Sequence, residues 1–461
     1  MVTKIRNGGL FLEFQKIKLH RSEKNRAAVT QITLDDDYNV PDYRQDIVKV
    51  IKERGELRFD EVKAMEGAAW IKGSLLFKVL YRSDKQEGKI SCLRGEIPFQ
   101  ERLNMDGLSE YDAVHATGDM EDLTIGVINS RKLNVRAVIV LTASSEKEVD
   151  EELTCELSDG SSYEQNIVEK EALKLLVVRR DICRQKSEAV LPSSKPNIRE
   201  ILWQSMQLRN VESRLVEGNI RLSGEILVSI LYNDEEEGEH LSWYETTVPL
   251  DAQAECGVME DDCIWQVQMV PLTMELEVKP DYDGEERILV MELALDTHIR
   301  IWKEEKIRLL TDLYSLQKEV KPVFRECPLE RLLVKNAAKC RMTEQMELKE
   351  DKEKVLQICS CEGKVLLERQ EIKPDGVLAE GTVEVNILYI TPDDHMPVGA
   401  VQEIYPFSQL VEIPEMSAQA KVELDASLEQ LSAVMLDQEH VEIRAAVRLD
   451  LIAFVQEAVS Y

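Results

Sequence analysis

The chain has 461 residues and a mass of 52.8 kDa, which is enough for about three domains. Hydrophobic residues make up 44% and charged residues 31%, a balance typical of a folded protein rather than a disordered one. The net charge of −30 argues against binding to nucleic acid or to anionic membranes. No apolar run could span a bilayer, residues 1–20 lack a secretory apolar core, and the nine cysteines are scattered without a CxxC pair. We therefore expect a cytoplasmic protein.

A nine-residue segment that begins with glycine and ends with tyrosine occurs three times, at residues 73–81, 224–232 and 381–389. A proline follows each tyrosine at one fixed distance, at Pro98, Pro249 and Pro406. A glycine precedes each segment, at Gly67, Gly218 and Gly376, and an aliphatic residue lies 20 positions before that glycine, at Ile47, Ile198 and Leu356. The period is the size of a whole domain, which predicts a tandem array of three similar domains.

The repeated segment has the alternation of a strand with one buried face. In the first copy Leu75, Phe77 and Val79 point one way, and Lys78 points the other. Each copy also ends in a longer alternating run, at residues 133–141, 289–301 and 441–451. We therefore expect a mainly β protein with three tandem antiparallel β-sandwich or barrel-like domains. Helical patterns are few and short, at residues 46–54 and 198–204.

Charged stretches follow the first two terminal runs, at residues 144–159 and 303–308. Such stretches are typical of domain boundaries. We therefore place the first domain at residues 1–145, a linker and the second domain at 146–302, and a linker and the third domain at 303–461.

Residues 39–47, Asn-Val-Pro-Asp-Tyr-Arg-Gln-Asp-Ile, resemble the PD-x-x-x-DI opening of the SPOCS domain, and the Gly67…Gly73…Tyr81 strand resembles the strand that follows it. SPOCS domains occur in the SipL-like proteins of endospore-forming Firmicutes, and the resemblance covers nearly the whole chain as three units. The second copy lacks both acids of the opening, and the third lacks its proline. SipL-like proteins usually end in a LysM module, which is associated with binding the coat-basement ATPase. The residues up to Tyr461 contain no LysM-like segment, so we expect the β domains to carry the partner contacts.

The resemblance implies a role in endospore formation, in spore-coat or envelope assembly within the mother-cell cytoplasm, including the forespore surface. The partners it implies are other sporulation and spore-coat proteins, with no nucleic acid and no membrane insertion. We expect a non-enzymatic scaffold, because tandem sheets suit multivalent docking. The alternative is a ligand- or glycan-binding β-domain protein of the cell envelope. The five tryptophans do not fall at equivalent repeat positions, which disfavours a repeated carbohydrate site.

The residue types that could carry chemistry lack the spacing that chemistry needs. No GxSxG, HExxH, P-loop or GxGxxG motif is present, and we expect His298 and His395 to be solvated surface residues. Cys359 and Cys361 should share one strand face and could join Cys340 at a metal, but the paired spacing of a zinc site is missing. The aspartates at 35–37 and 281–283 lack the spacing of a calcium loop. We expect no catalytic residue, no metal and no cofactor.

One acidic cluster is the candidate for binding a partner. Glu235, Glu236 and Glu237 lie at a predicted hairpin tip, where a solvated loop and a docking loop are both consistent with the sequence. Together with the acidic stretch at 146–159, they are the residues we expect to meet basic surfaces of other proteins. Such exposed contacts control the association rate more than the affinity, and salt weakens them.

Overall fold

The computed structural model describes residues 2–7, 10–83, 88–158, 163–235, 240–258, 260, 262–317, 319, 321–349, 352–414, 416–417 and 419–461, and within these it describes no side chains for residues 2–12 and 23–26. All regular structure in the described residues is β, as nineteen strands in six antiparallel sheets. The mainly β prediction is therefore confirmed. The short helices expected at 46–54 and 198–204 are wrong, because these residues lie in loops and in strands β3 and β9.

Each domain has six strands. The first domain contains β2 (Leu10–Asn39), β3 (Lys49–Met65), β4 (Ala68–Arg82), β5 (Ile90–Asn104), β6 (Val114–Asn129) and β7 (Lys132–Leu157), preceded by β1 (Val2–Asn7). The second contains β8 (Glu164–Val190), β9 (Ile198–Val216), β10 (Asn219–Asp234), β11 (Leu241–Glu255), β12 (Ile264–Pro280) and β13 (Glu286–Tyr314). The third contains β14 (Glu326–Glu347), β15 (Gln357–Lys373), β16 (Gly376–Ile390), β17 (Val398–Glu412), β18 (Lys421–Met435) and β19 (His440–Ser460).

The same sandwich is built three times. The first, fifth and sixth strands of each domain form an outer sheet, in the orders β2-β7-β6, β8-β13-β12 and β14-β19-β18. The second, third and fourth strands form an inner sheet, in the orders β3-β4-β5, β9-β10-β11 and β15-β16-β17. The six sheets remain separate, so the sandwich form of the expected fold is the correct one.

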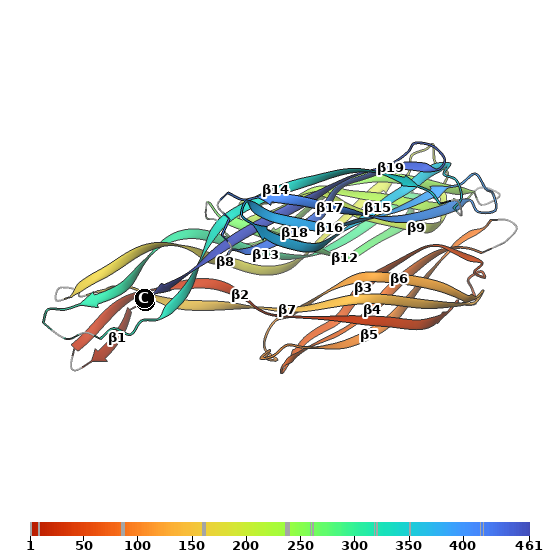
Figure 1. The fold of residues 1–461 in the computed structure, drawn as a ribbon. Helices are drawn as coiled ribbons and strands as arrows, with labels where there is room; N and C mark the ends of the chain where they lie inside the picture. Colours follow the sequence, from red (N-terminus) through yellow and green to blue (C-terminus); the bar gives the residue numbers. More distant parts are fainter. Residues whose placement is uncertain are drawn as a thin grey trace.

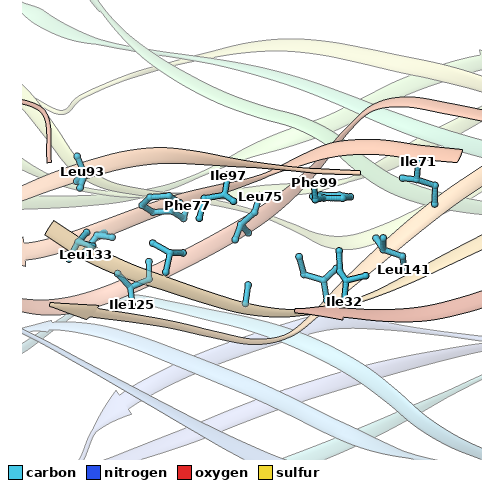
Figure 2. Packing of buried hydrophobic residues seen from close by; sticks show 14 of the residues in the cluster. Ile32, Ile71, Leu75, Phe77, Leu93, Ile97, Phe99, Ile125, Leu133 and Leu141 are labelled. Atoms are coloured by element: carbon cyan, nitrogen blue, oxygen red, sulfur yellow. The ribbon is translucent and has the colours of Figure 1, made fainter. Parts of the chain in front are cut away.

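The alternation of the repeated segment correctly identifies the side chains of the first core. Leu75, Phe77 and Val79 are buried between the two sheets of the first domain. Figure 2 shows Leu75 and Phe77 on the inner sheet opposite Ile125 and Leu133 of the outer sheet. The ring of Tyr38 meets Phe77 edge to face, with the ring centroids 5.0 Å apart. Equivalent alternating strands build the cores of the other two domains.

The outer sheets extend beyond the sandwiches as three two-stranded ribbons. The third strand of each outer sheet, β6, β12 or β18, stops opposite residue 145, 302 or 454 of the central strand. Beyond that point only two strands continue, and they pair 14–22 with 148–157, 164–175 with 302–314 and 326–334 with 453–460. Figure 1 shows these ribbons leaving the sandwiches together, toward the end where the C-terminus lies. We call them the stalk, and the three sandwiches the head. The domain limits expected after residues 145 and 302 thus fall inside the continuous strands β7 and β13.

The stalk is held by its own apolar core, which explains why charged sequence continues as strand. Leu19 and Leu153 come from the first domain, Ala172, Ile307 and Leu309 from the second, and Cys327, Leu329 and Val459 from the third. All eight are buried, while the residues between them carry the charges. The part of the chain that the structure describes contains no helix able to cross a membrane.

The three inner sheets meet edge to edge around the centre of the head. Strand β5 contacts β9, β11 contacts β15 and β17 contacts β3, so each domain touches both of the others. The sheet faces turned away from the sandwich cores share an apolar cluster, which we call the central cluster. Its buried members are Leu80, Ile90, Cys92, Leu202, Trp203, Leu231, Cys359, Leu388 and Val398. Both faces of each inner sheet are thus covered at this level.

Candidate functional site

The loops at the end of the head opposite the stalk form one repeated structure, which we call the apex. It comprises the described residues of 40–48, 191–197 and 348–356, the adjoining β4–β5, β10–β11 and β16–β17 loops, and the turns at 130–131, 281–285 and 436–439. In each domain the loop between the first and second strands, which we call the opening loop, is bound by a backbone hydrogen bond to the last turn or to the strand just after it: Val40 N donates to Arg131 O, Leu191 N to Arg287 O and Leu348 N to Glu439 O. The apex includes the PD-x-x-x-DI segment.

The repeated tyrosine, on the third strand of each domain, anchors the opening loop by a hydrogen bond. Tyr81, Tyr232 and Tyr389 are fully buried, and each hydroxyl donates to the backbone carbonyl that lies 36 positions earlier in the chain. The acceptors are the carbonyl oxygens of Gln45, Pro196 and Glu353, at 3.1, 3.1 and 3.2 Å. Burial raises the pKa of Tyr232 and Tyr389 to about 12, so the hydroxyls remain donors at neutral pH. Each of these tyrosines is thus packed inside its domain and also holds the apex loop by a hydrogen bond.

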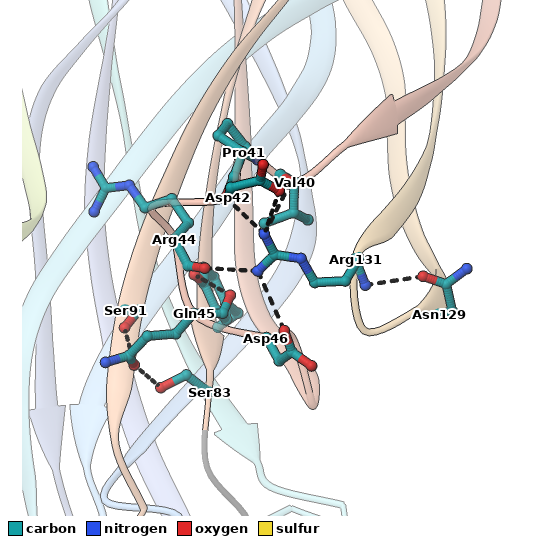
Figure 3. A network of polar contacts seen from close by, with 11 residues as sticks. Val40, Pro41, Asp42, Arg44, Gln45, Asp46, Ser83, Ser91, Asn129 and Arg131 are labelled. Atoms are coloured by element: carbon teal, nitrogen blue, oxygen red, sulfur yellow. Dashed lines mark hydrogen bonds and ion pairs between the residues drawn. The ribbon is translucent and has the colours of Figure 1, made fainter.

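Arg131 holds the opening loop of the first domain. Its acceptors are the carbonyl oxygens of Val40, Pro41 and Arg44 and the carboxylates of Asp42 and Asp46, at 2.7 to 3.5 Å. Figure 3 shows the guanidinium group of Arg131 inside the curve of this loop. The two acids of the PD-x-x-x-DI motif therefore have a structural role, since both bind Arg131. Sequence reasoning missed Arg131, whose signal is its place two residues before the terminal alternating run.

The other two domains vary the same contact. In the second, Arg287 donates to the carbonyl oxygens of Leu191, Pro192 and Lys195 and to the amide oxygen of Asn197, which stands where the first domain has Asp46. In the third domain the charges are exchanged, because Glu439 stands in the place of Arg131 and its carboxylate pairs with Lys354 at 3.0 Å. An arginine thus holds the opening loops of the first and second domains through their backbone carbonyls. In the third domain an ion pair with the charges exchanged joins the opening loop to the last turn.

The backbone also corrects one position of the sequence repeat. The two-residue turn before the repeated strand contains Gly67 and Gly218, but Asp375 holds that place in the third domain and Gly376 already belongs to β16. The residue equivalent to Ile47 and Ile198 is therefore Val355, which is buried, and not the exposed Leu356. The one-residue offset arises because the sequence comparison aligned glycines rather than hydrogen-bonded positions.

The apex loops of different domains touch one another. Arg44 of the first domain pairs with Glu200 of the second at 3.1 Å. Arg82 of the first donates to the carbonyl oxygen of His395 in the third at 3.1 Å. The apex is therefore a surface to which the three domains contribute, rather than three isolated loop sets.

This surface exposes aromatic and acidic side chains. Tyr43 is 81% exposed, and Tyr282 and Leu436 are also exposed. The carboxylates of Asp42 and Asp437 lie beside them at the surface. Aromatic rings that can stack on cations and carboxylates that can pair with them suit a basic protein surface.

Glu235, the described residue of the predicted acidic site, lies at the apex end of the head, directly after β10. Glu235 is held there by Asn197, whose backbone oxygen accepts from Glu235 N at 3.3 Å and whose side-chain amide donates to the carboxylate at 3.2 Å. Glu236 and Glu237 lie outside the described residues. The other predicted stretch, at 146–159, is not at the apex, because most of it forms the stalk part of β7.

His298 is not a solvated surface residue, so that expectation is wrong. It lies between the first two domains, with its Nε2 atom 3.1 Å from Oε2 of Glu146 and both side chains nearly buried. Although burial alone would raise the pKa of Glu146, hydrogen bonds from His298 and Ser22 lower it to about 2. Burial, together with the nearby Arg180 and His298, lowers the pKa of His115 to about 4. The alternating strand correctly places His298 on the outer face, which the neighbouring domain covers.

Cys340, Cys359 and Cys361 do not come together at one site. A bulge at Cys359 sends its side chain to the central cluster, while Cys361 packs toward the core of the third domain, so the expected shared face is wrong. Burial raises the pKa of both thiols to about 12. Cys340 lies at the margin of the third core. Among the described residues no group of three or more His, Cys, Asp or Glu side chains could hold a metal ion.

Comparison with known families gives one match, found twice. The family model described as SipL, SPOCS domain, matches residues 46–128 and 354–436. Both matches begin at equivalent places in the fold, one residue before the buried Ile47 and Val355. The match indicates a sporulation-associated domain. The comparisons with curated proteins and with solved structures give no match.

Proposed function

Because residues 46–128 and 354–436 match the SPOCS-domain family, we propose that the chain is a non-enzymatic assembly protein of endospore formation that binds other sporulation proteins through its apex. The observation that carries this proposal is the joining of the apex loops. The three domains share the central cluster, and the loops that hold the family motif face one end of the head and contact each other. A surface of this kind can bind a partner at several points, and binding does not cost the conformational entropy of ordering the loops.

The chemistry of the apex supports partners with basic surfaces. Exposed Tyr43 and Tyr282 and the carboxylates around Glu235 match lysine- and arginine-rich surfaces, and the net charge of −30 favours their approach from a distance. We propose that these partners are spore-coat or envelope-assembly proteins. We place the protein in the mother-cell cytoplasm, where assembly at the forespore surface would occur.

The test is an association experiment on the full chain. The partner is first isolated by affinity purification from sporulating cells, and its association rate with the pure protein is then measured at low and high salt. Replacing Glu235, Glu236 and Glu237 together by Gln should slow association several-fold at low salt and leave the unfolding midpoint unchanged.

A charge-matched variant serves as the control. Glu164, Glu171 and Glu304 are exposed residues of the stalk, so replacing them by Gln removes the same charge far from the apex. This variant should keep nearly the wild-type rate. Equal slowing in both triple variants would indicate an effect of net charge alone and would contradict docking at the apex. Turnover of a small substrate by the pure protein would contradict the non-enzymatic role.

A further inference from the structure

Below the central cluster lies a second set of inward-facing residues, which we call the polar centre. Strand register places Arg54 opposite Lys78 in the first domain, Ser205 opposite Ser229 in the second, and Glu362 opposite Asn386 in the third. One step nearer the apex, the equivalent inward positions are Lys52, Trp203 and Ser360. All three domains therefore contribute to this centre, with different residues at equivalent positions.

One buried carboxylate, that of Glu362, binds two cations of the polar centre. Glu362 accepts hydrogen bonds from Lys52 Nζ at 3.0 Å, from Arg54 Nη1 at 3.2 Å and from Trp203 Nε1 at 3.0 Å. These donors come from the first and second domains, and the acceptor comes from the third. Lys78 adds a further cation at the same level. Arg54 also pairs with Glu56 at 2.9 Å, so three cations stand against two carboxylates and positive charge is in excess inside a chain whose net charge is −30.

Lys78 has no hydrogen-bond acceptor among the described residues, although its Nζ atom is buried. The Lys78 ammonium lies 5.1 Å from the ring centroid of Trp203. The face of the ring attracts a cation, but it is not a conventional acceptor for the N–H donors of the ammonium. Burial lowers the pKa of Lys78 to about 8, so the side chain is still mostly charged at neutral pH. A buried charge of this kind normally has a partner of opposite charge.

Two hydroxyl groups of the polar centre are also buried without a hydrogen-bond partner among the described residues. The Oγ atoms of Ser205 and Ser360 are buried, and the described residues offer neither of them a hydrogen-bond partner. Ser205 is two positions from Trp203 on the same inward face, and Ser360 is two positions from Glu362. The polar centre therefore combines an unpaired ammonium with hydroxyl donors, while the carboxylate of Glu362 is already occupied by three other donors.

We propose that the polar centre binds a small monovalent inorganic anion, of the class of chloride, between Lys78 and the hydroxyl groups of Ser205 and Ser360. The anion would accept the donors that the protein leaves unpaired and would offset part of the excess positive charge. Because its ligands come from all three domains, binding would hold the head together. This inference is independent of the proposed function of the apex.

The test measures the thermal unfolding midpoint of the full chain against chloride concentration, with gluconate keeping the ionic strength constant. The midpoint should rise with chloride and then level off, as expected for a ligand that binds only the folded state. The Lys78→Met variant keeps the length of the side chain and should lose this response. Lys72→Met is the control, because Lys72 is exposed on the same strand, and it should respond like the wild type.

A second measurement locates the anion directly. Crystals grown with bromide in place of chloride should give an anomalous peak near Lys78 Nζ in the wild type and none in Lys78→Met. If Lys78→Met does not fold, the double variant Ser205→Ala and Ser360→Ala provides the comparison and should weaken the chloride response several-fold. A wild-type midpoint that is independent of chloride, or a response that Lys78→Met retains in full, would overturn the proposal.

Discussion

Replacing Glu362 by Gln should separate the cost of a stranded buried cation from that of a lost surface contact. Glutamine keeps the volume and can still accept from Trp203, but it removes the carboxylate that binds Lys52. Lys52 is 6% exposed, so its charge cannot return to water. Arg54 is one-third exposed and keeps its pair with Glu56 at 2.9 Å, so it adds little. Removing one partner of a buried ion pair costs about 3–5 kcal/mol, and with one stranded cation we expect about 3 kcal/mol.

The assay is denaturant unfolding followed by tryptophan fluorescence, since Trp203 lies at the substituted site. The matched control is Asp251→Asn, which breaks the two-pronged but exposed pair with Arg221 and should leave the unfolding midpoint almost unchanged. Adding Lys52→Met to Glu362→Gln should recover part of the loss, because no stranded charge remains. Equal effects of Glu362→Gln and Asp251→Asn would refute the argument that burial determines the cost.

Two further changes test the loop anchors and the contact between the first two domains. Tyr232→Phe removes the donor to the carbonyl oxygen of Pro196 and should cost about 1–3 kcal/mol in denaturant unfolding, while the exposed Tyr282→Phe should cost nothing measurable. The folded protein keeps His115 neutral down to about pH 4, whereas the unfolded chain takes up a proton below about pH 6.5. Stability present above pH 6.5 should therefore fall as the pH drops toward 4. His115→Asn should flatten this fall in midpoints measured at pH 7, 5.5 and 4.5, and an unchanged profile would contradict the assignment.

Alternation correctly predicted which way the side chains of the repeated strand point, but not what covers them. Phe77 and Lys78 do lie on opposite faces of β4, as a period of two requires. The face of Lys78 looked solvated from the sequence because it mixes polar and apolar residues. In the fold that face meets two other domains, so the Nζ atom of Lys78 is buried. Packing between domains leaves no periodic signal within one strand, and His298 was misjudged for the same reason.

The false helix at residues 46–54 has a specific cause. Apolar residues crowd there without alternating, a pattern that short helices also produce. In the structure a bulge between Val50 and Lys52 turns Val50 to the core of the first domain and Ile51 to the central cluster. Two buried faces and one extra residue together remove the period of two. Arg131 escaped prediction because its partners are mostly backbone carbonyls, which are present in any sequence.

Because of the polar centre, the three domains cannot replace one another. Equivalent inward positions carry Arg54, Ser205 and Glu362, so the one acid and its donors occur once each in every molecule. Three identical copies of the first domain would bring cations to this place without the acid that binds them, and three copies of the third would bring the acid without a cation. A free homotrimer of such domains could not satisfy its own interior. Covalent linkage allows each copy to diverge toward its neighbours, and a chimera in which one domain replaces another should therefore lose its interior contacts before its surface contacts.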